Sequence, residues 1–378
     1  MNFNVLQYLP KNTKIKMDNR LRKTFFLTKS VSAWGKFLSV PLKNISRYIN
    51  GTRAMPITLL NELINLKGAD INKLQDKIEL KISKSGNYLK IGPFIDINEN
   101  WVYVGELIKG DGHIPQNFWN ITFVNNNKTL INHVKDFFTL LGIKKNQMML
   151  IEREDANFLI IRSAVLAHLF NKILDIPVGK KSELNIPEFI LLNLPLSIAA
   201  VRGAFDAEGS VTFTGKGSRR ISITSNSKNW LSQIREILEQ IRINSIISED
   251  KSKRRIPIYR LLVYRRSNLK RFLKIINPLH PKRREKLIQI LNNYRRNPTR
   301  EFHKRILLSI KNGNIRKRDI SKDIKQNLVL VGNNINWLKK KGYIIPFEKV
   351  VTNKGSFYKY RITFEGEEYL EKSLSFFD

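Results

Sequence analysis

The sequence contains no cysteine, and its five histidines are scattered along the chain. The lack of cysteine excludes disulfide bonds, cysteine-ligated zinc sites and thiol catalysis. The histidines do not form a cluster of metal ligands in the sequence. The chain is therefore neither a disulfide scaffold nor a cysteine-based enzyme, and this composition fits an intracellular protein.

Long apolar runs are also absent from the sequence. No stretch approaches the ~20 apolar residues that a helix needs to span a bilayer. Residues 1–16 lack the apolar segment of a signal peptide. We therefore expect a cytoplasmic protein with no membrane partner.

Acidic residues are few relative to basic ones. Lys and Arg number 67 against 32 Asp and Glu, which gives a formal net charge of +35. Such an excess repels itself unless a polyanion neutralises it, and each phosphate contact of a nucleic acid releases a counterion and adds affinity. Nucleic acid is therefore the expected partner. The 378 residues, 42% of them hydrophobic, are enough for two to four folded domains.

Residues 1–82 are expected to form a helical domain of the helix-turn-helix type. Apolar residues recur at helical spacing in three segments, residues 30–38, 42–49 and 56–66. The second helix would enter a major groove, and a generic helical bundle is the alternative. The DNA-contacting candidates on this helix are Lys43, Asn44 and Arg47. A segment rich in Ser, Gly, Pro and Asn at 81–100 indicates a domain boundary.

An internal repeat follows, and its two copies are expected to span residues 95–195 and 196–295. The first copy reads WVYVGELIKGDGHI, NITFVNNNKTLINHVKDFFTLLGI, NFLIIRSAVLAHLFNKIL and VGKKSE. The second copy reads SIAAVRGAFDAEGSVTF, RRISITSNSKNWLSQIREILEQIRI, YRLLVYRRSNLKRFLKII and HPKRREK. Each copy predicts the order αββαββα, so the fold class is α+β.

The first helix of each copy ends in an acid that is followed by glycine. Asp111 and Glu208 are these acids, and they are 208 − 111 = 97 positions apart. Carboxylate oxygens are the ligands that hard cations such as Mg²⁺ prefer, and such a cation activates water for phosphodiester hydrolysis. Close packing of the two helices would place the acids side by side. The small residues available for that packing are Gly105, Ala200, Gly203 and Ala204.

The segments VGELIKGDG and VRGAFDAEG resemble the two signature motifs of the LAGLIDADG (DOD-type) homing endonucleases, in their two-motif monomeric form. The resemblance covers about residues 95–295. It implies two pseudo-symmetric αββαββα halves that form a saddle over double-stranded DNA, in a monomer with internal pseudo-twofold symmetry. It also implies that Asp111 and Glu208 are the catalytic, metal-binding acids, with Mg²⁺ or Mn²⁺ as cofactor.

Two residues depart from this motif. Glu106 and Arg202 are bulky and charged at positions where the motif usually has small residues. We expect them either to form an ion pair at the helix ends or to face solvent. The alignment of the two repeats also pairs Arg162 with Arg265, both of which are candidate DNA contacts, but it assigns no catalytic role to either.

Residues 251–300 hold 17 Lys or Arg and one acidic residue, interleaved with strand and helix residues. This pattern is typical of a folded basic surface. Equivalent places in the two repeats carry candidates for phosphate contact, namely Lys180, Lys181, Lys282, Arg283 and Arg284. Arginines near predicted strands are candidates for reading guanine in the major groove, namely Arg219, Arg220, Arg260 and Arg265. The alternative for each of them is a solvated surface charge.

Residues 300–378 are expected to form a winged-helix domain. Three helical segments precede two strand-like runs, at residues 302–310, 319–324, 329–340, 343–350 and 357–364. The third helix would read DNA through Asn333 and Asn334, while the hairpin would contact the backbone. A small α+β domain without DNA contact is the alternative.

The favoured function is a metal-dependent, site-specific double-strand DNA endonuclease, associated with the nucleoid when it is bound to DNA. Two alternatives remain. One is a DNA-binding regulator on a non-cleaving scaffold of the same kind, and the other is a maturase whose partner is intron RNA. Metal-dependent nicking would separate the endonuclease from the regulator.

Overall fold

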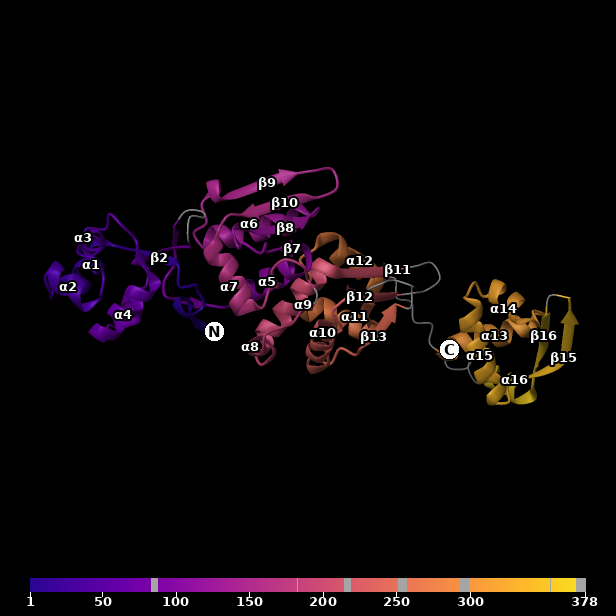
Figure 1. The fold of residues 1–378 in the computed structure, drawn as a ribbon. Coiled ribbons are helices and arrows are strands. Elements are labelled where there is room, and N and C mark those ends of the chain that lie inside the picture. Colours follow the sequence, from indigo (N-terminus) through magenta and orange to yellow (C-terminus); the bar gives the residue numbers. More distant parts are fainter. Residues whose placement is uncertain are drawn as a thin grey trace. The chain divides into compact units, whose positions relative to one another are not determined.

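The structure is a computed structural model that describes residues 1–82, 88–181, 183–213, 219–250, 257–292, 299–353 and 355–371. The chain divides into two compact units (Figure 1). The first contains residues 1–212 and 219–291, and residues 292–378 make up most of the second. Both units mix helices and strands, in agreement with the predicted fold class. The described part of the chain has no helix that is both long enough and apolar enough to cross a bilayer.

The N-terminal part of the first unit contains a sheet that the sequence did not lead us to expect. In β2 (Thr13–Met17) and β4 (Ile78–Ile82), buried residues alternate with more exposed ones, and the two strands pair antiparallel. The region at 1–82, which we expected to be a helical domain, therefore also contains strands, because two short alternating segments from its opposite ends pair with each other. The sheet order is β3-β2-β4-β5, with the outer strands β3 (Met55–Pro56) and β5 (Leu89–Lys90). A two-stranded sheet joins β1 (Asn2–Asn4) to β6 (Phe94–Asp96).

Four helices accompany this sheet, namely α1 (Asn19–Phe26), α2 (Val31–Phe37), α3 (Leu42–Ile49) and α4 (Ile57–Lys67). The last three correspond to the three predicted helical segments. Trp34 is buried, and its indole N–H donates to the carbonyl of Phe26 at 3.2 Å, which holds α2 against α1. Gly68 ends α4 in a left-handed conformation with φ 53°, which glycine adopts without steric cost.

Two halves with the same element order form the rest of the first unit. The first half consists of α5 (Glu99–Asp111), β7 (Gly112–His113), β8 (Ile121–Asn125), α6 (Lys128–Leu140), β9 (Met148–Glu152), β10 (Asn157–Ile161) and α7 (Ala164–Leu174). The second half consists of α9 (Leu194–Glu208), β11 (Gly209–Phe213), β12 (Arg219–Ser225), α10 (Lys228–Gln240), β13 (Ser245–Asp250), β14 (Ile258–Val263) and α11 (Arg266–Ile275). Both sheets have the same strand order, β7-β8-β10-β9 and β11-β12-β14-β13. The short helix α8 (Glu188–Leu191) precedes the second half, and α12 (Pro281–Asn292) follows it.

The two halves meet along α5 and α9, which lie side by side (Figure 1). A Cβ atom on Gly203 would lie 2.6 Å from the carbonyl oxygen of Tyr103 and 2.8 Å from the Cβ atom of Glu106. A Cβ atom on Gly110 would lie 2.5 Å from that of Ala207. Real side chains do not tolerate such distances, so glycine at these two positions is what lets the helices approach.

The second unit contains α13 (Thr299–Lys311), α14 (Lys317–Asp323), α15 (Leu328–Lys340), β15 (Ile344–Thr352), β16 (Gly355–Ile362) and α16 (Phe364–Glu371). Its buried core includes Ile306, Val331, Ile335 and Leu338. Three helices and a hairpin follow one another in the predicted order, and α16 is an addition to it. The turn predicted at 353–355 includes Lys354, which lies outside the described residues.

The helix pair supplies the first testable prediction. We expect Gly203→Ala to lower the free energy of unfolding by about 1–3 kcal/mol, because the added methyl group overpacks the contact with Tyr103 and Glu106. Calorimetric unfolding of the full chain measures the change.

Gly332→Ala is the matched control, because this glycine also lies within a helix, and the nearest atoms to the added methyl group would be those at the flexible end of Lys317. Because the Lys317 side chain can move aside, Gly332→Ala should not lower the free energy of unfolding, and loss of a helical glycine should raise it by up to about 1 kcal/mol. Equal, small effects of the two changes would contradict the close packing of α5 on α9.

Candidate functional site

The two predicted acids are the last residues of the paired helices. Asp111 ends α5 and Glu208 ends α9. The carboxylate of Glu208 lies beside Gly110, the residue that precedes Asp111. A Cβ atom on Gly110 would be 3.6 Å from Oε1 of Glu208. The helix pair thus brings together two acids that are far apart in the sequence.

The two carboxylates share one electrostatic environment. Partial burial, together with the charge of Glu208, raises the pKa of Asp111 to about 6, against the opposing effects of a hydrogen bond from Asn125 and the charges of Arg283 and Lys181. Burial likewise raises the pKa of the Glu208 carboxyl, while Lys181 and Arg283 oppose the rise. Asp111 is half-buried, whereas Glu208 is exposed as a whole residue. Negative charge at this point is therefore only partly neutralised by the chain itself.

Two basic side chains hold the C-terminal ends of the paired helices. The Nζ atom of Lys181 donates to the carbonyl of Gly110 at 2.5 Å. Arg283 donates to the carbonyls of Phe205 at 2.8 Å and Ala207 at 3.0 Å, and also to that of Asp206. Cations are favourable at helix C-termini, where unpaired carbonyls carry partial negative charge. Burial lowers the pKa of both bases, and the nearby carboxylates counteract that effect.

Glu106 takes neither of the two arrangements expected from the sequence. It is buried, and its carboxylate lies 2.5 Å from Nζ of Lys109 and accepts a hydrogen bond from the indole of Trp230 at 2.9 Å. Lys109 also donates to the carbonyl of Asn185 at 2.6 Å. The expected pairing with Arg202 is wrong, because Arg202 instead donates through Nε to the carbonyl of Ile276 at 2.6 Å.

Asn125 and Asp206 are site residues that the sequence analysis missed. The amide of Asn125 donates to Asp111 at 2.8 Å. Asp206 is fully buried, and it accepts hydrogen bonds from the hydroxyl of Tyr103 at 2.9 Å and from the backbone N–H groups of Leu279 at 2.8 Å and His280 at 3.2 Å. A second charged residue, after Arg202, inside a largely apolar helix was the available signal for Asp206. No sequence pattern signalled Asn125.

The other residues of the repeats that were predicted to contact DNA differ in their solvent exposure. Several basic side chains are exposed, namely Arg162, Lys180, Arg260, Arg265, Lys282 and Arg284. Arg219 and Arg220 are half-buried on β12. Ser163 caps α7 and Arg265 occupies the same capping position before α11, so the structure aligns Arg265 with Ser163 rather than with Arg162. Residues 251–256 and 293–298 of the predicted basic surface lie outside the described residues.

The predicted contacts outside the repeats also differ in accessibility. Lys43 and Arg47 are exposed on α3, where Asn44 accepts a hydrogen bond from Arg53 at 2.7 Å. In the second unit Asn333 is exposed. Asn334 already bonds to His303 at 2.9 Å and to the carbonyl of Leu330 at 2.8 Å, so its amide is engaged within its own unit.

The more open faces of the two sheets differ in chemistry. In the first sheet Ile160 lies opposite Met149, and Phe158 lies opposite Val124, and all four side chains remain partly exposed. In the second sheet the equivalent central strand carries Arg260, which lies between Thr224 and Ser248 and shares a face with them. The centre of the first face is therefore apolar, whereas the second face is polar around Arg260 and apolar at Ile246 and Leu262.

The residues at the helix ends fit a divalent cation of the hard, oxygen-preferring type. Two carboxylates with raised pKa values supply oxygen donors, and a cation would relieve their mutual repulsion. Across the described residues no group of three or more His, Asp or Glu side chains could hold a metal. Ligands beyond these would have to come from water or from a bound phosphate.

Comparison with known proteins identifies part of this fold. Residues 196–277 match the family model of the LAGLIDADG-like domain, so the chain contains such a domain. The structure of I-DmoI in complex with DNA and Mn matches at 19% identity and a TM-score of 0.37, over 47% of this chain and 96% of that one. Full-length DUF199/WhiA from Thermatoga maritima matches at 12% identity and a TM-score of 0.36, over 65% of this chain and 93% of that one. None of the curated proteins compared with the chain matches it.

The raised pKa of Asp111 predicts that this acid destabilises the fold at neutral pH. A folded-state pKa of about 6, above the usual value of 3.8, means that stability is fully present below pH ~4 and is lost as the pH rises through about 6. Without metal, Asp111→Asn should raise the free energy of unfolding at pH 7.5 by on the order of 1–3 kcal/mol and change it little at pH 4. Urea unfolding at the two pH values measures this.

Asp155→Asn, in an exposed bend, is the control and should show no such pH dependence. An Asp111→Asn variant that is less stable than the native chain at pH 7.5 would mean that the carboxylate is not under electrostatic strain.

Proposed function

We propose that the chain is a site-specific double-stranded DNA endonuclease of the LAGLIDADG homing type, with Asp111 and Glu208 as its catalytic acids. One observation carries the proposal. The paired ends of α5 and α9 carry one acid from each half in a common environment, where burial and the charge of Glu208 raise the pKa of Asp111. The LAGLIDADG-like domain at 196–277, which includes Glu208, supports the assignment.

Asp111 and Glu208 would hold Mg²⁺ or Mn²⁺, and the bound ion would supply an activated water and offset charge on the phosphodiester. The chain's own residues set the geometry. Lys181 and Arg283 hold the carbonyls at the helix ends, so that the two carboxylates stay in place when a phosphate arrives. Asn125 orients the carboxylate of Asp111 through its hydrogen bond.

The more open faces of the two sheets would form the saddle, with a pseudo-twofold axis between α5 and α9 in a monomer. Exposed Lys180, Lys282 and Arg284 would contact phosphates, which position the protein without reading sequence. Arg260 on the second face would reach a base edge. The proposed helix-turn-helix and winged-helix regions would lengthen the footprint, and the protein would act wherever its DNA target lies inside the cell.

A DNA-binding regulator on the same scaffold is the second candidate. The exposed Lys43 and Arg47 of α3 favour it, because they offer basic side chains outside the two halves that carry the acids. This candidate differs from the first in a single property, which is the absence of cleavage.

Cleavage separates the two candidates. A duplex obtained by selecting cleaved sites from a random library should be cut in the presence of Mg²⁺. Asp111→Asn and Glu208→Gln should each reduce the single-turnover rate at least about a hundredfold, the scale expected when a group that stabilises transition-state charge is lost. Gel shifts should show that both variants still bind the duplex within a fewfold of the native chain.

Asp155→Asn serves again as the control and should cut at the native rate. Native protein that binds duplexes tightly but cuts none of them with Mg²⁺ or Mn²⁺ would support the regulator and end the endonuclease proposal.

The contrast between the two sheet faces predicts how the halves of the target are read. The apolar face around Ile160 should contact thymine methyl groups, which are the apolar feature of the major groove. Replacing a contacted thymine by uracil should weaken binding about fourfold, from about 0.8 kcal/mol for each buried methyl-sized group. Titration of duplexes with single uracil substitutions measures the effect.

Ile160→Ser should abolish the penalty at the contacted thymine and leave the other half of the target unaffected. Uracil penalties of equal size in both halves, unchanged by Ile160→Ser, would contradict this assignment of the two faces.

A further inference from the structure

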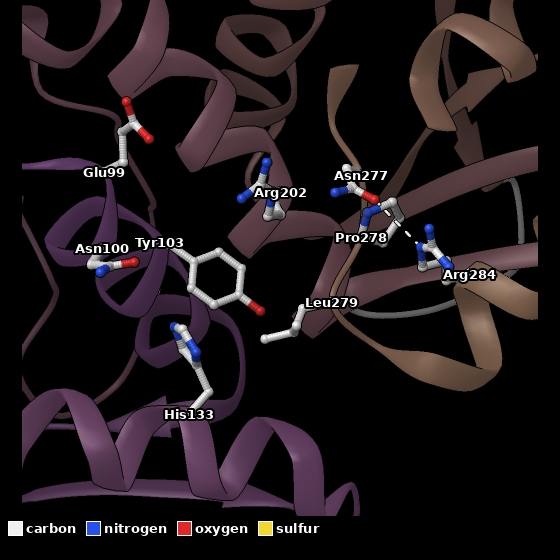
Figure 2. Close-up of a pocket in the computed structure, with 9 residues that line it drawn as sticks. All are labelled: Glu99, Asn100, Tyr103, His133, Arg202, Asn277, Pro278, Leu279 and Arg284. Atoms are coloured by element: carbon white, nitrogen blue, oxygen red, sulfur yellow. Dashed lines mark hydrogen bonds between the residues drawn. The ribbon is translucent and has the colours of Figure 1, made fainter. Parts of the chain in front are cut away.

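A pocket of about 320 Å³ lies between the two halves, beside α5 and α9 (Figure 2). Its wall comes from both halves and contains neither of the two acids proposed for cleavage. Arg284 is the one lining residue that is also proposed above as a DNA phosphate contact. The volume is at the lower end of the range of small-molecule sites, about 300–1,000 Å³. The residues that line it are Glu99, Asn100, Tyr103, His133, Arg202, Asn277, Pro278, Leu279 and Arg284.

Several polar groups at this pocket have unused hydrogen-bonding capacity within the described part of the chain. Arg202 uses only Nε, on the carbonyl of Ile276, and no described residue accepts from its two terminal nitrogens. Arg284 likewise uses only Nε, on the side chain of Asn277 at 3.4 Å. The Nε2 atom of His133 is buried without a hydrogen-bond partner among the described residues. A buried polar group without a partner is costly, which favours a ligand that satisfies it.

The charges of the pocket are separated along its length. Figure 2 shows Glu99 and Asn100 at one end and Arg284 at the other, with the ring of Tyr103 between them. Burial raises the pKa of Tyr103 and lowers that of His133, and Arg202 lies close enough to both for its positive charge to act against the first shift and add to the second. A matching ligand has an anion with several oxygens at the arginine end, donor groups near Glu99, and an apolar surface against Tyr103.

We infer that this pocket binds a nucleoside monophosphate. Its phosphate lies between Arg202 and Arg284, since guanidinium groups match the geometry of phosphate oxygens. The hydroxyl or amino groups of the nucleoside donate toward Glu99 and Asn100. A bare phosphate fills only the arginine end, and a nucleoside without phosphate leaves both guanidinium groups unsatisfied.

The pocket also touches the hydrogen bonds that join the two halves. Tyr103 and Leu279 line it, and both donate to Asp206, which lies two positions before Glu208. A ligand held against Tyr103 and Leu279 therefore restrains the contact between the halves. Its binding should raise the unfolding temperature of the first unit as the ligand concentration rises.

Titration calorimetry of the full chain with uridine 5′-monophosphate, uridine and inorganic phosphate tests the inference. The monophosphate should bind with one-to-one stoichiometry and at least about tenfold more tightly than either of the other two probes, because it alone engages both ends of the pocket. Arg202→Met should weaken its binding at least about tenfold, as expected when one charge-assisted contact is lost. Arg284→Gln, at a more exposed site, should weaken it by a smaller factor.

Arg266→Gln, an exposed arginine at the start of α11, is the matched control and should bind as the native chain does. Asp111→Asn should also leave binding unchanged, so this result is independent of whether the chain cuts DNA. If Arg202→Met unfolds at a lower temperature than the native chain, its weaker binding could reflect lost stability. The binding of the monophosphate by Arg284→Gln then decides the test. No saturable binding of the monophosphate, or equal binding by the native, Arg284→Gln and Arg266→Gln proteins, would overturn the inference.

Discussion

The close approach of α5 and α9 is the constraint on which the rest of the structure depends. It requires glycine at Gly203 and Gly110, where any side chain would collide with the partner helix. It also concentrates negative charge, because two helix C-termini and two carboxylates meet at one place. Packing alone would not hold such an arrangement. Lys181 and Arg283 offset part of the charge by donating to the carbonyls at the helix ends.

The two halves hold Lys181 and Arg283 in place through buried side chains of opposite charge. Lys109 and Asp206 occupy equivalent positions in the motif helices, and both are fully buried. Lys109 donates to the carbonyl of Asn185, shortly after Lys181, whereas Asp206 accepts from two backbone N–H groups shortly before Arg283. Each motif helix thus anchors the segment that carries the base for its own end. The two halves are therefore pseudo-symmetric in where these contacts lie, but the side chain that makes the contact is basic in the first half and acidic in the second.

The repeat and its two acids could be predicted because both are local in sequence. Each copy of the repeat contains an apolar helix that ends in an acid and glycine. One such helix is common, but two of them at the same place in matching repeats indicate a functional motif. The environment of Glu106 could not be predicted, since its partner Trp230 is 124 positions away and its partner Lys109 looks like a surface residue. The N-terminal sheet was missed for a similar reason, because β2 and β4 pair across an intervening helical segment.

The central claim is that two carboxylates from different halves form one metal-binding site. Calorimetric titration of Mn²⁺ into the protein bound to a selected DNA duplex tests this claim most directly. The account predicts that either single carboxamide substitution, at Asp111 or at Glu208, removes binding of the ion that the two acids share. Ions that persist unchanged in both single variants, or two independent sites each lost only with its own acid, would contradict a shared site.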